Sequence, residues 1–143
     1  MLKQRLMRRF AAFTLVELMI VVVIVAILAL VAIPMYSTNV TAARMSEAVA
    51  GAGTVRSALR TWLATHGGTF PATGAPTKLS DIGFNSNDLD GKYVDQADYS
   101  FTATASSANF KVTYATGSKA ATGMQGYVID QAGVESGAWK TGN

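Results

Sequence analysis

The fold is decided by a stretch near the N-terminus, Arg8-Arg9-Phe10-Ala11-Ala12-Phe13-Thr14-Leu15-Val16-Glu17-Leu18, in which basic residues give way to a long apolar run. No polar side chain occurs from Leu18 to Ile33, and the 21 residues from Phe13 to Ile33 are interrupted only by Thr14 and Glu17. As an α-helix, such a run spans roughly 31 Å, close to the hydrocarbon thickness of a bilayer. The run is therefore predicted to be a membrane-spanning helix.

The residues before this run set its orientation. Residues 1–12 contain four basic residues and no acidic residue: Lys3, Arg5, Arg8 and Arg9. Positive charge is usually retained on the cytoplasmic side of a membrane helix. Residues 1–12 are therefore expected in the cytoplasm and the rest of the chain outside it.

Glu17 does not fit an ordinary membrane anchor. A carboxylate inside an apolar helix costs about 2.5–3.5 kcal/mol on insertion scales, and such residues usually have a partner and a function. No basic residue follows within the run. One possible partner is the α-amino group that a cut just before Phe13 would create; the alternative is a neutral carboxyl group in the headgroup region. A secretory signal peptidase cuts beyond the apolar region, whereas here the small residues Ala11 and Ala12 precede it.

These residues resemble the N-terminus of the type IV pilin and pseudopilin family, which is marked by a short basic leader, a small residue, Phe-Thr-Leu-Val-Glu-Leu and an apolar helix. The match covers residues 8–34. The resemblance implies that a prepilin peptidase and N-methyltransferase cuts between Ala12 and Phe13, removes the leader 1–12 and methylates the new amine of Phe13. Family members more often carry Gly than Ala before the cut.

The resemblance also implies how the helix at 13–34 is used. It first spans the membrane and then packs in the core of a filament. We expect Glu17 to pair there with the amine of Phe13 on an adjacent subunit, because this pairing explains both the cleavage signal and the charge. Pro34 would lie within one long helix that loosens on assembly. The alternative is a helix break at the membrane exit, because proline lacks an N–H and clashes with the carbonyl of Leu30. A kink or local unwinding is expected near Leu30–Pro34.

Residues 35–143 are predicted to form a globular head. Apolar residues recur at steps of three, four and seven from 35 to 66, which predicts an amphipathic helix that ends at His66-Gly67-Gly68. A loop is predicted at 67–91, and an antiparallel sheet with a C-terminal tail at 92–143. The apolar face of the helix consists of Val40, Ala43, Ala48, Val49, Ala52, Val55, Leu59, Trp62 and Leu63, and the loop is expected to be pinned to the core by Leu79, Ile82, Phe84 and Leu89.

Alternating polar and β-branched or aromatic residues predict the strands of this sheet. The predicted strands are Tyr93–Val94, Tyr99–Thr104, Phe110–Tyr114 and Gly126–Asp130, with turns at 105–109 and 115–123. Trp139 is expected to tether the tail. The predicted fold class is α+β and type IV pilin-like: a long N-terminal helical spine, apolar in its first half, with an antiparallel sheet packed on its C-terminal half.

Composition argues against several classes of function. The chain has 12 Lys and Arg against 9 Asp and Glu, but without the leader it keeps eight basic and nine acidic side chains, so no specific nucleic-acid binding is predicted. It has no cysteine, hence no disulfide and no thiolate metal site, and its one histidine, His66, lies at a predicted helix end. No phosphate loop or catalytic triad can be assembled, so we predict no enzyme activity and no cofactor.

Two groups of charged residues leave alternatives open. Four acidic residues lie close together in sequence, and the stretch 86–91 partly imitates the start of a calcium loop; the four are Asp88, Asp90, Asp95 and Asp98. The position of the closing carboxylate falls on Ala97, so a solvated acidic loop is favoured over a calcium site. Arg56 and Arg60 lie one helical turn apart, where an exposed helix face is favoured over contact with a phosphate or an acidic neighbour.

Three functions remain. The favoured one is the structural subunit of a type IV pilus, a homopolymer formed through the N-terminal helices for adhesion, motility or DNA uptake. The second is a pseudopilin of a type II secretion system. The third is a monomeric membrane-anchored binding module, which leaves Glu17 and the Ala12–Phe13 junction unexplained.

The favoured function also predicts partners and location. The partners are the prepilin peptidase and N-methyltransferase, the inner-membrane pilus assembly machinery and other copies of the chain. The protein would be a single-pass inner-membrane protein before assembly and part of an extracellular filament afterwards.

Overall fold

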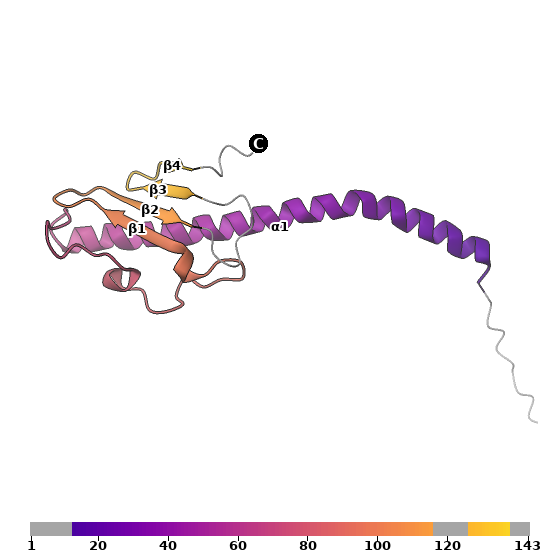
Figure 1. The fold of residues 1–143 in the computed structure, drawn as a ribbon, viewed down its shortest axis with the longest axis horizontal. Coiled ribbons are helices and arrows are strands. Elements are labelled where there is room, and N and C mark those ends of the chain that lie inside the picture. The colour runs from indigo at the N-terminus through magenta and orange to yellow at the C-terminus, as the bar shows by residue number, and fades with distance from the viewer. Residues whose placement is uncertain (1–12, 116–125, 138–143) are drawn as a thin grey trace, which may run out of the picture. The chain divides into compact units, whose positions relative to one another are not determined.

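The computed structural model describes residues 13–115 and 126–137, which fall into two units, 13–39 and the described residues from Val40 onward. The helices are α1 (Leu15–Thr65) and two short 3-10 helices, η1 (Leu79–Ile82) and η2 (Gln96–Asp98). The strands are β1 (Tyr99–Ala103), β2 (Phe110–Tyr114), β3 (Tyr127–Asp130) and β4 (Glu135–Ser136) (Figure 1). A long N-terminal helix followed by a four-stranded antiparallel sheet confirms the predicted α+β, pilin-like fold.

The first unit contains the apolar part of α1, which continues through Pro34. The hydroxyl groups of Ser37 and Thr38 both donate to the carbonyl oxygen of Pro34, at 2.8 and 3.1 Å. Proline removes one N–H from the helical ladder, and the turns on either side keep the segment helical. The alternative of a helix break at Pro34 and the local unwinding expected near Leu30–Pro34 are therefore wrong, and the kink expected there stays a prediction.

The second unit has a core that α1 shares with the sheet and the loops. The buried residues of α1 follow one another at steps of three or four, which confirms the amphipathic face. The buried face begins later than predicted, because Val40 is only half-buried and Ala43 is exposed. The core consists of Ala48, Ala52, Val55, Leu59 and Leu63 from α1, together with Phe70, Val94, Tyr99, Phe110, Val112, Tyr114, Tyr127 and Ile129.

The sheet has the strand order β1-β2-β3-β4, and each neighbouring pair is antiparallel. Three predicted strands are present to within one residue at either end, but the predicted strand at Tyr93–Val94 is wrong. The N–H of Tyr93 donates to the carboxylate of Glu47 at 3.2 Å, and the carbonyl of Val94 closes a turn by accepting from the N–H of Gly91. These partners come from outside the sheet, so the segment joins no ladder.

β4 was not predicted, because only two residues of the expected tail form it. Glu135 pairs with Ile129 after a turn in which Gly133 has a φ of 90°, a conformation that favours glycine. Trp139 and most of the predicted turn at 115–123 lie outside the described residues.

The C-terminus of α1 ends as the sequence predicts. Gly67 and Gly68 have φ values of 86° and 80°, and the N–H of Gly68 donates to the carbonyl of Leu63 at 2.7 Å. This is the Schellman arrangement, in which a left-handed glycine satisfies the last carbonyls of a helix. The position at which α1 ends is therefore determined by the local sequence.

The loop between α1 and β1 lies against the core as predicted, with half-buried Leu79, Ile82, Phe84 and Leu89 packed against the buried cluster. Within it, the carboxylate of Asp81 accepts from the backbone N–H groups of Thr77 and Lys78, both at 2.9 Å. These two hydrogen bonds lower the pKa of Asp81 below its usual value. The loop therefore has fixed local structure in addition to its apolar contacts.

Besides the hydrogen bond from Tyr93 to Glu47, two further long-range contacts tie α1 to the rest of the head. The hydroxyl of Tyr99 donates to the carbonyl of Ala48 at 3.3 Å and lies directly over Gly51. Arg56 donates through Nε to the carbonyl of Asp130 at 3.0 Å and through a terminal nitrogen to the carbonyl of Gln131 at 2.9 Å. The prediction of an exposed face is therefore wrong for Arg56, whose guanidinium holds the end of β3.

Candidate functional site

The candidate site is the beginning of α1. Phe13 and Thr14 precede the helix, and the N–H of Glu17 donates to the hydroxyl oxygen of Thr14 at 3.2 Å. The carbonyl of Thr14 accepts from the N–H of Leu18, also at 3.2 Å. Thr14 is therefore the N-cap of α1, and it satisfies a donor that the helix start would leave unpaired.

The sequence contained a signal for this cap. Thr14-Leu15-Val16-Glu17 has the Ser/Thr-x-x-Glu pattern of a capping box, in which the third helical residue is acidic. Thr14 is thus more than an interruption of the apolar run, and its capping role was not predicted from the sequence. The pattern places the helix start two residues after the predicted cleavage point.

The cap places Glu17 in the first turn of α1. A carboxylate at a helix N-terminus is stabilised by the helix dipole by about 0.3–1 kcal/mol, which offsets part of the cost of placing it near a membrane. Glu17 is exposed, and within the described part of the chain no side chain hydrogen-bonds or ion-pairs with its carboxylate. The charge is therefore held in place by the helix and remains available to a partner.

The other predicted site residues lie at different distances from Glu17. Phe13 is 78 % exposed and lies just before the helix, whereas Ala12 lies outside the described residues. Pro34 is 17 residues from Glu17 on the same helix, a separation of roughly 26 Å. The structure therefore groups Phe13 with Glu17 and separates Pro34 from them.

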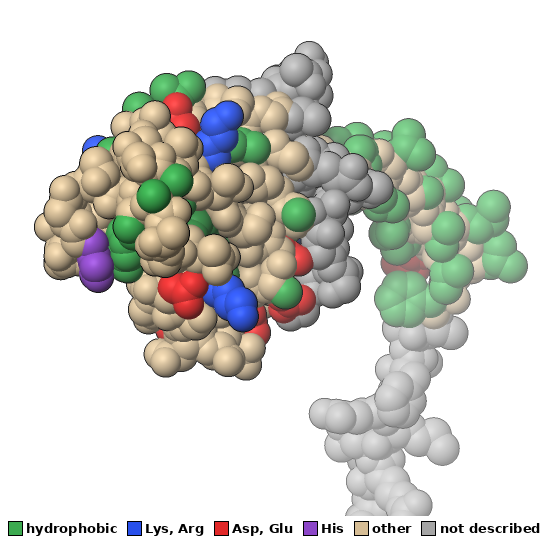
Figure 2. All heavy atoms as spheres, turned by 60° about the vertical axis from the view of Figure 1, so that its left-hand side comes forward, with side chains coloured by type: hydrophobic (Ala, Val, Ile, Leu, Met, Phe, Trp, Pro, Cys, Tyr) green, Lys and Arg blue, Asp and Glu red, His purple; other side chains and the backbone are tan. Residues whose placement is uncertain are grey.

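The surface of the first unit is almost entirely apolar. Its large apolar side chains are between 51 % and 81 % exposed from Phe13 to Tyr36. The most apolar 18-residue window of α1 has a mean hydropathy of 3.2, and none of it is buried. Figure 2 shows hydrophobic side chains over the described N-terminal helix. A patch of this size on a protein surface marks a site that lipid or protein covers.

The acidic residues of the head do not converge. Asp88, Asp90 and Asp98 each accept a backbone N–H close in sequence, from Asn85, Gln96 and Asp95 respectively. Within residues 13–115 and 126–137, no three histidine or carboxylate side chains come close enough together to hold a metal ion. These carboxylates cap local turns.

His66 has a structural environment. Its ring stacks on Trp62 with centroids 4.0 Å apart, and its Nδ1 lies 2.9 Å from the carbonyl oxygen of Trp62. A contact with a carbonyl of the last helical turn is the ordinary role of a histidine at a helix C-terminus.

Comparison with known proteins identifies the N-terminal segment. Residues 7–33 match the family model described as the prokaryotic N-terminal methylation motif. This motif is the hallmark of type IV pilin and pseudopilin prepilins, so the resemblance drawn from the sequence is confirmed. Such proteins are structural subunits. Searches of the curated proteins and of the solved structures gave no match.

Proposed function

From the methylation motif of type IV pilin and pseudopilin prepilins, we propose that this chain is the precursor of a pilus subunit that polymerises through its N-terminal helix into a surface filament. The observation that carries the proposal is the N-capped carboxylate of Glu17 beside Phe13, at the start of a helix whose apolar side chains are exposed.

Processing is the first step of the proposed function. Cleavage between Ala12 and Phe13 by a prepilin peptidase removes the basic leader and creates an α-amino group four residues before Glu17. The same enzyme then methylates that amine. The cut leaves Thr14, and therefore the cap of α1, intact.

Assembly is the second step. The exposed side chains of the first unit are covered by lipid before assembly and by the equivalent helices of other subunits afterwards. Full burial of one Val, Leu or Ile side chain contributes about 1.5–3 kcal/mol in water, but helices that leave a bilayer gain mainly packing contacts. A pairing between Glu17 and the amine of Phe13 on the next subunit then selects one register among many apolar ones.

A pilin is favoured over a pseudopilin by the head. The resemblance implies a compact and often calcium-bound C-terminal loop for major pseudopilins. Within residues 13–115 and 126–137, Asp88, Asp90 and Asp98 accept backbone N–H groups of nearby residues, and no three histidine or carboxylate side chains come close enough together to hold a metal ion. This supports a surface filament for adhesion, motility or DNA uptake, reached from a single-pass position in the inner membrane.

Intact mass and N-terminal sequencing of protein from sheared surface material test this proposal. We expect a chain that begins at Phe13 and is heavier by one methyl group. A cut and methylated chain that occurs only in the membrane or periplasm would indicate a pseudopilin. Recovery of only the chain that begins at Met1 would contradict both filament functions and leave a tethered module.

A further inference from the structure

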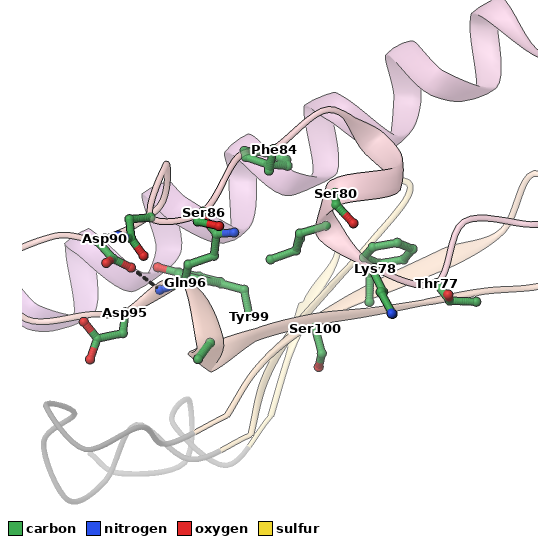
Figure 3. A pocket seen from close by; sticks show the side chains of 14 residues that line it. Thr77, Lys78, Ser80, Phe84, Ser86, Asp90, Asp95, Gln96, Tyr99 and Ser100 are labelled. Atoms are coloured by element: carbon green, nitrogen blue, oxygen red, sulfur yellow. Dashed lines mark hydrogen bonds between the residues drawn. The ribbon is translucent and has the colours of Figure 1, made fainter.

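A groove runs along one edge of the sheet in the head (Figure 3). Its volume is about 660 Å³. One wall is formed by the loop around η1, including Lys78, Leu79 and Phe84, and the opposite wall by residues 99–101 of β1. The groove thus lies between an edge strand and a loop that is held to the core.

The register of the sheet defines which backbone groups face this groove. Thr104 N–H donates to the carbonyl of Asn109 at 2.9 Å, and Ala115 N–H donates to the carbonyl of Asp98 at 2.8 Å. Bonded pairs alternate along an antiparallel ladder, so the even-numbered residues of β1 bond to β2. The odd-numbered residues direct their N–H and C=O groups away from β2.

Two of these residues leave the edge of the sheet open. In the described ranges of the chain, no hydrogen bond involves the N–H or C=O of Phe101 or Ala103. Natural edge strands are usually protected by lysine, proline, a bulge or a covering segment, and β1 contains no charged residue, proline or glycine. An exposed edge of this kind is a template for an added strand.

The two ends of the groove carry side chains of opposite charge. Figure 3 places Asp90 and Asp95 at one end of the groove and Lys78 towards the other. The half-buried side chains of Leu79 and Phe84 contribute apolar surface to the wall. The groove therefore suits an extended segment that carries an aromatic side chain on the face towards Leu79 and Phe84 and a basic side chain that reaches the end with Asp90 and Asp95.

We propose that residues 138–143 of a second copy of this chain, Ala-Trp-Lys-Thr-Gly-Asn, bind in this groove as a strand added to β1. The segment lies outside the described residues, and it follows β4, which forms the opposite edge of the sheet. It supplies Lys140 for the acidic end and Trp139 for the apolar wall. Six extended residues span about 20 Å, enough to cover the five residues of β1.

This inference rests on the proposed filament. A contact between opposite edges of successive heads is heterologous, and such a contact continues indefinitely instead of closing. It would join the heads laterally, in addition to the packing of the N-terminal helices. Loss of this contact should therefore weaken filaments without abolishing processing or helix packing.

Cysteine cross-linking tests the contact, because the natural chain has no cysteine. Ser100→Cys and Thr141→Cys are expressed on separate, differently tagged copies of the full chain, so that any bond between them joins two molecules. Intact filaments are then oxidised. We expect a covalent dimer that carries both tags. The matched control replaces Ser100→Cys by Thr61→Cys, which is exposed on α1 and outside the groove, and should give no such dimer.

A second variant tests the strand itself. Ala103→Pro removes an N–H that points away from β2 at the free edge of β1, next to the groove residues 99–101, and leaves the bonds from β1 to β2 in place. In the Ser100→Cys background it should abolish the dimer with Thr141→Cys while the protein is still cut and assembled. If Ser100→Cys and Thr141→Cys copies without the Ala103→Pro change form filaments but give no covalent dimer, the groove contact is overturned, while the proposed function as a pilus subunit is unaffected. In a further variant, Ser100→Cys and Thr141→Cys are placed on the same copy. If their disulfide then forms only within single chains and never between two, the proposed contact between copies is overturned as well.

Discussion

Glu17 and Thr14 have separate roles at the start of α1. Thr14 satisfies the N–H of Glu17, and the helix dipole stabilises the carboxylate, so the charge has a fixed position at the first turn. The cap needs only the backbone of Glu17, and therefore the side chain can act elsewhere. This separation allows the two roles to be tested independently.

We predict that Glu17→Ala is inserted and cut but assembles poorly. Removal of one member of a buried ion pair costs about 3–5 kcal/mol per contact, because the other charge stays buried without a partner. Filament in sheared surface material should fall sharply relative to the membrane pool, as measured by immunoblot. Thr14→Ala is the control: it removes the cap, worth about 1 kcal/mol, but keeps the carboxylate. Equal loss of filament in both variants would mean that helix stability, not the carboxylate, limits assembly.

At the scale of the element, the packing of α1 against β1 depends on one glycine of two. A Cβ atom at Gly51 would overlap the hydroxyl of Tyr99, whereas a Cβ atom at Gly53 would meet nothing within 4 Å. Both glycines are helical and both have lower helix propensity than alanine. Only Gly51 is thus required by the contact with the sheet.

We predict opposite effects for alanine at these two positions. Gly51→Ala should destabilise the head by about 1–3 kcal/mol, because the Tyr99 ring must move from a closely packed position. Gly53→Ala should stabilise it by about 0.5–1 kcal/mol through helix propensity. Denaturant unfolding of the full chain in detergent, followed by near-ultraviolet circular dichroism, measures both. Changes of the same sign would show that Tyr99 is not packed over Gly51 in solution.

The elements that the sequence predicted well are those with strong local signals. The apolar run, the apolar steps along α1 and the glycine pair at its end depend on neighbouring residues only, and so do the alternating residues of Phe110–Tyr114. The features that the sequence did not predict depend on contacts between residues that are distant in sequence. Arg56 reaches carbonyls more than 70 residues away, and β4 is too short for a pattern. In the candidate site, the cost of a carboxylate in an apolar helix predicts a role for Glu17, whereas the only signal for Thr14 is the capping pattern of residues 14–17.

The two units of the chain differ in how their apolar side chains are covered. The first exposes apolar side chains that need a partner, and the second buries its own core and a set of tyrosines within it. Burial raises the pKa of Tyr99 and Tyr114 above the usual value, and burial with the nearby carboxylate of Glu135 raises the pKa of Tyr127 to about 12. The head should therefore be sensitive to high pH.

Stability should fall at high pH, because the folded head favours the neutral form of these tyrosines. A tyrosine with a folded pKa above its unfolded value of 10 contributes its full stability below pH 10 and loses it as the pH rises through the folded value, so for Tyr127 the window is pH 10 to about 12. Tyr127→Phe cannot ionise. At neutral pH it should be less stable than the parent by about 1 kcal/mol, since the hydroxyl donates to Glu135 Oε1 at 3.2 Å. Above pH 10 this deficit should shrink and then reverse. Denaturant unfolding of both proteins at a series of pH values measures the difference, and a deficit that stays constant from neutral pH to pH 12 would show that Tyr127 is not held neutral by the fold.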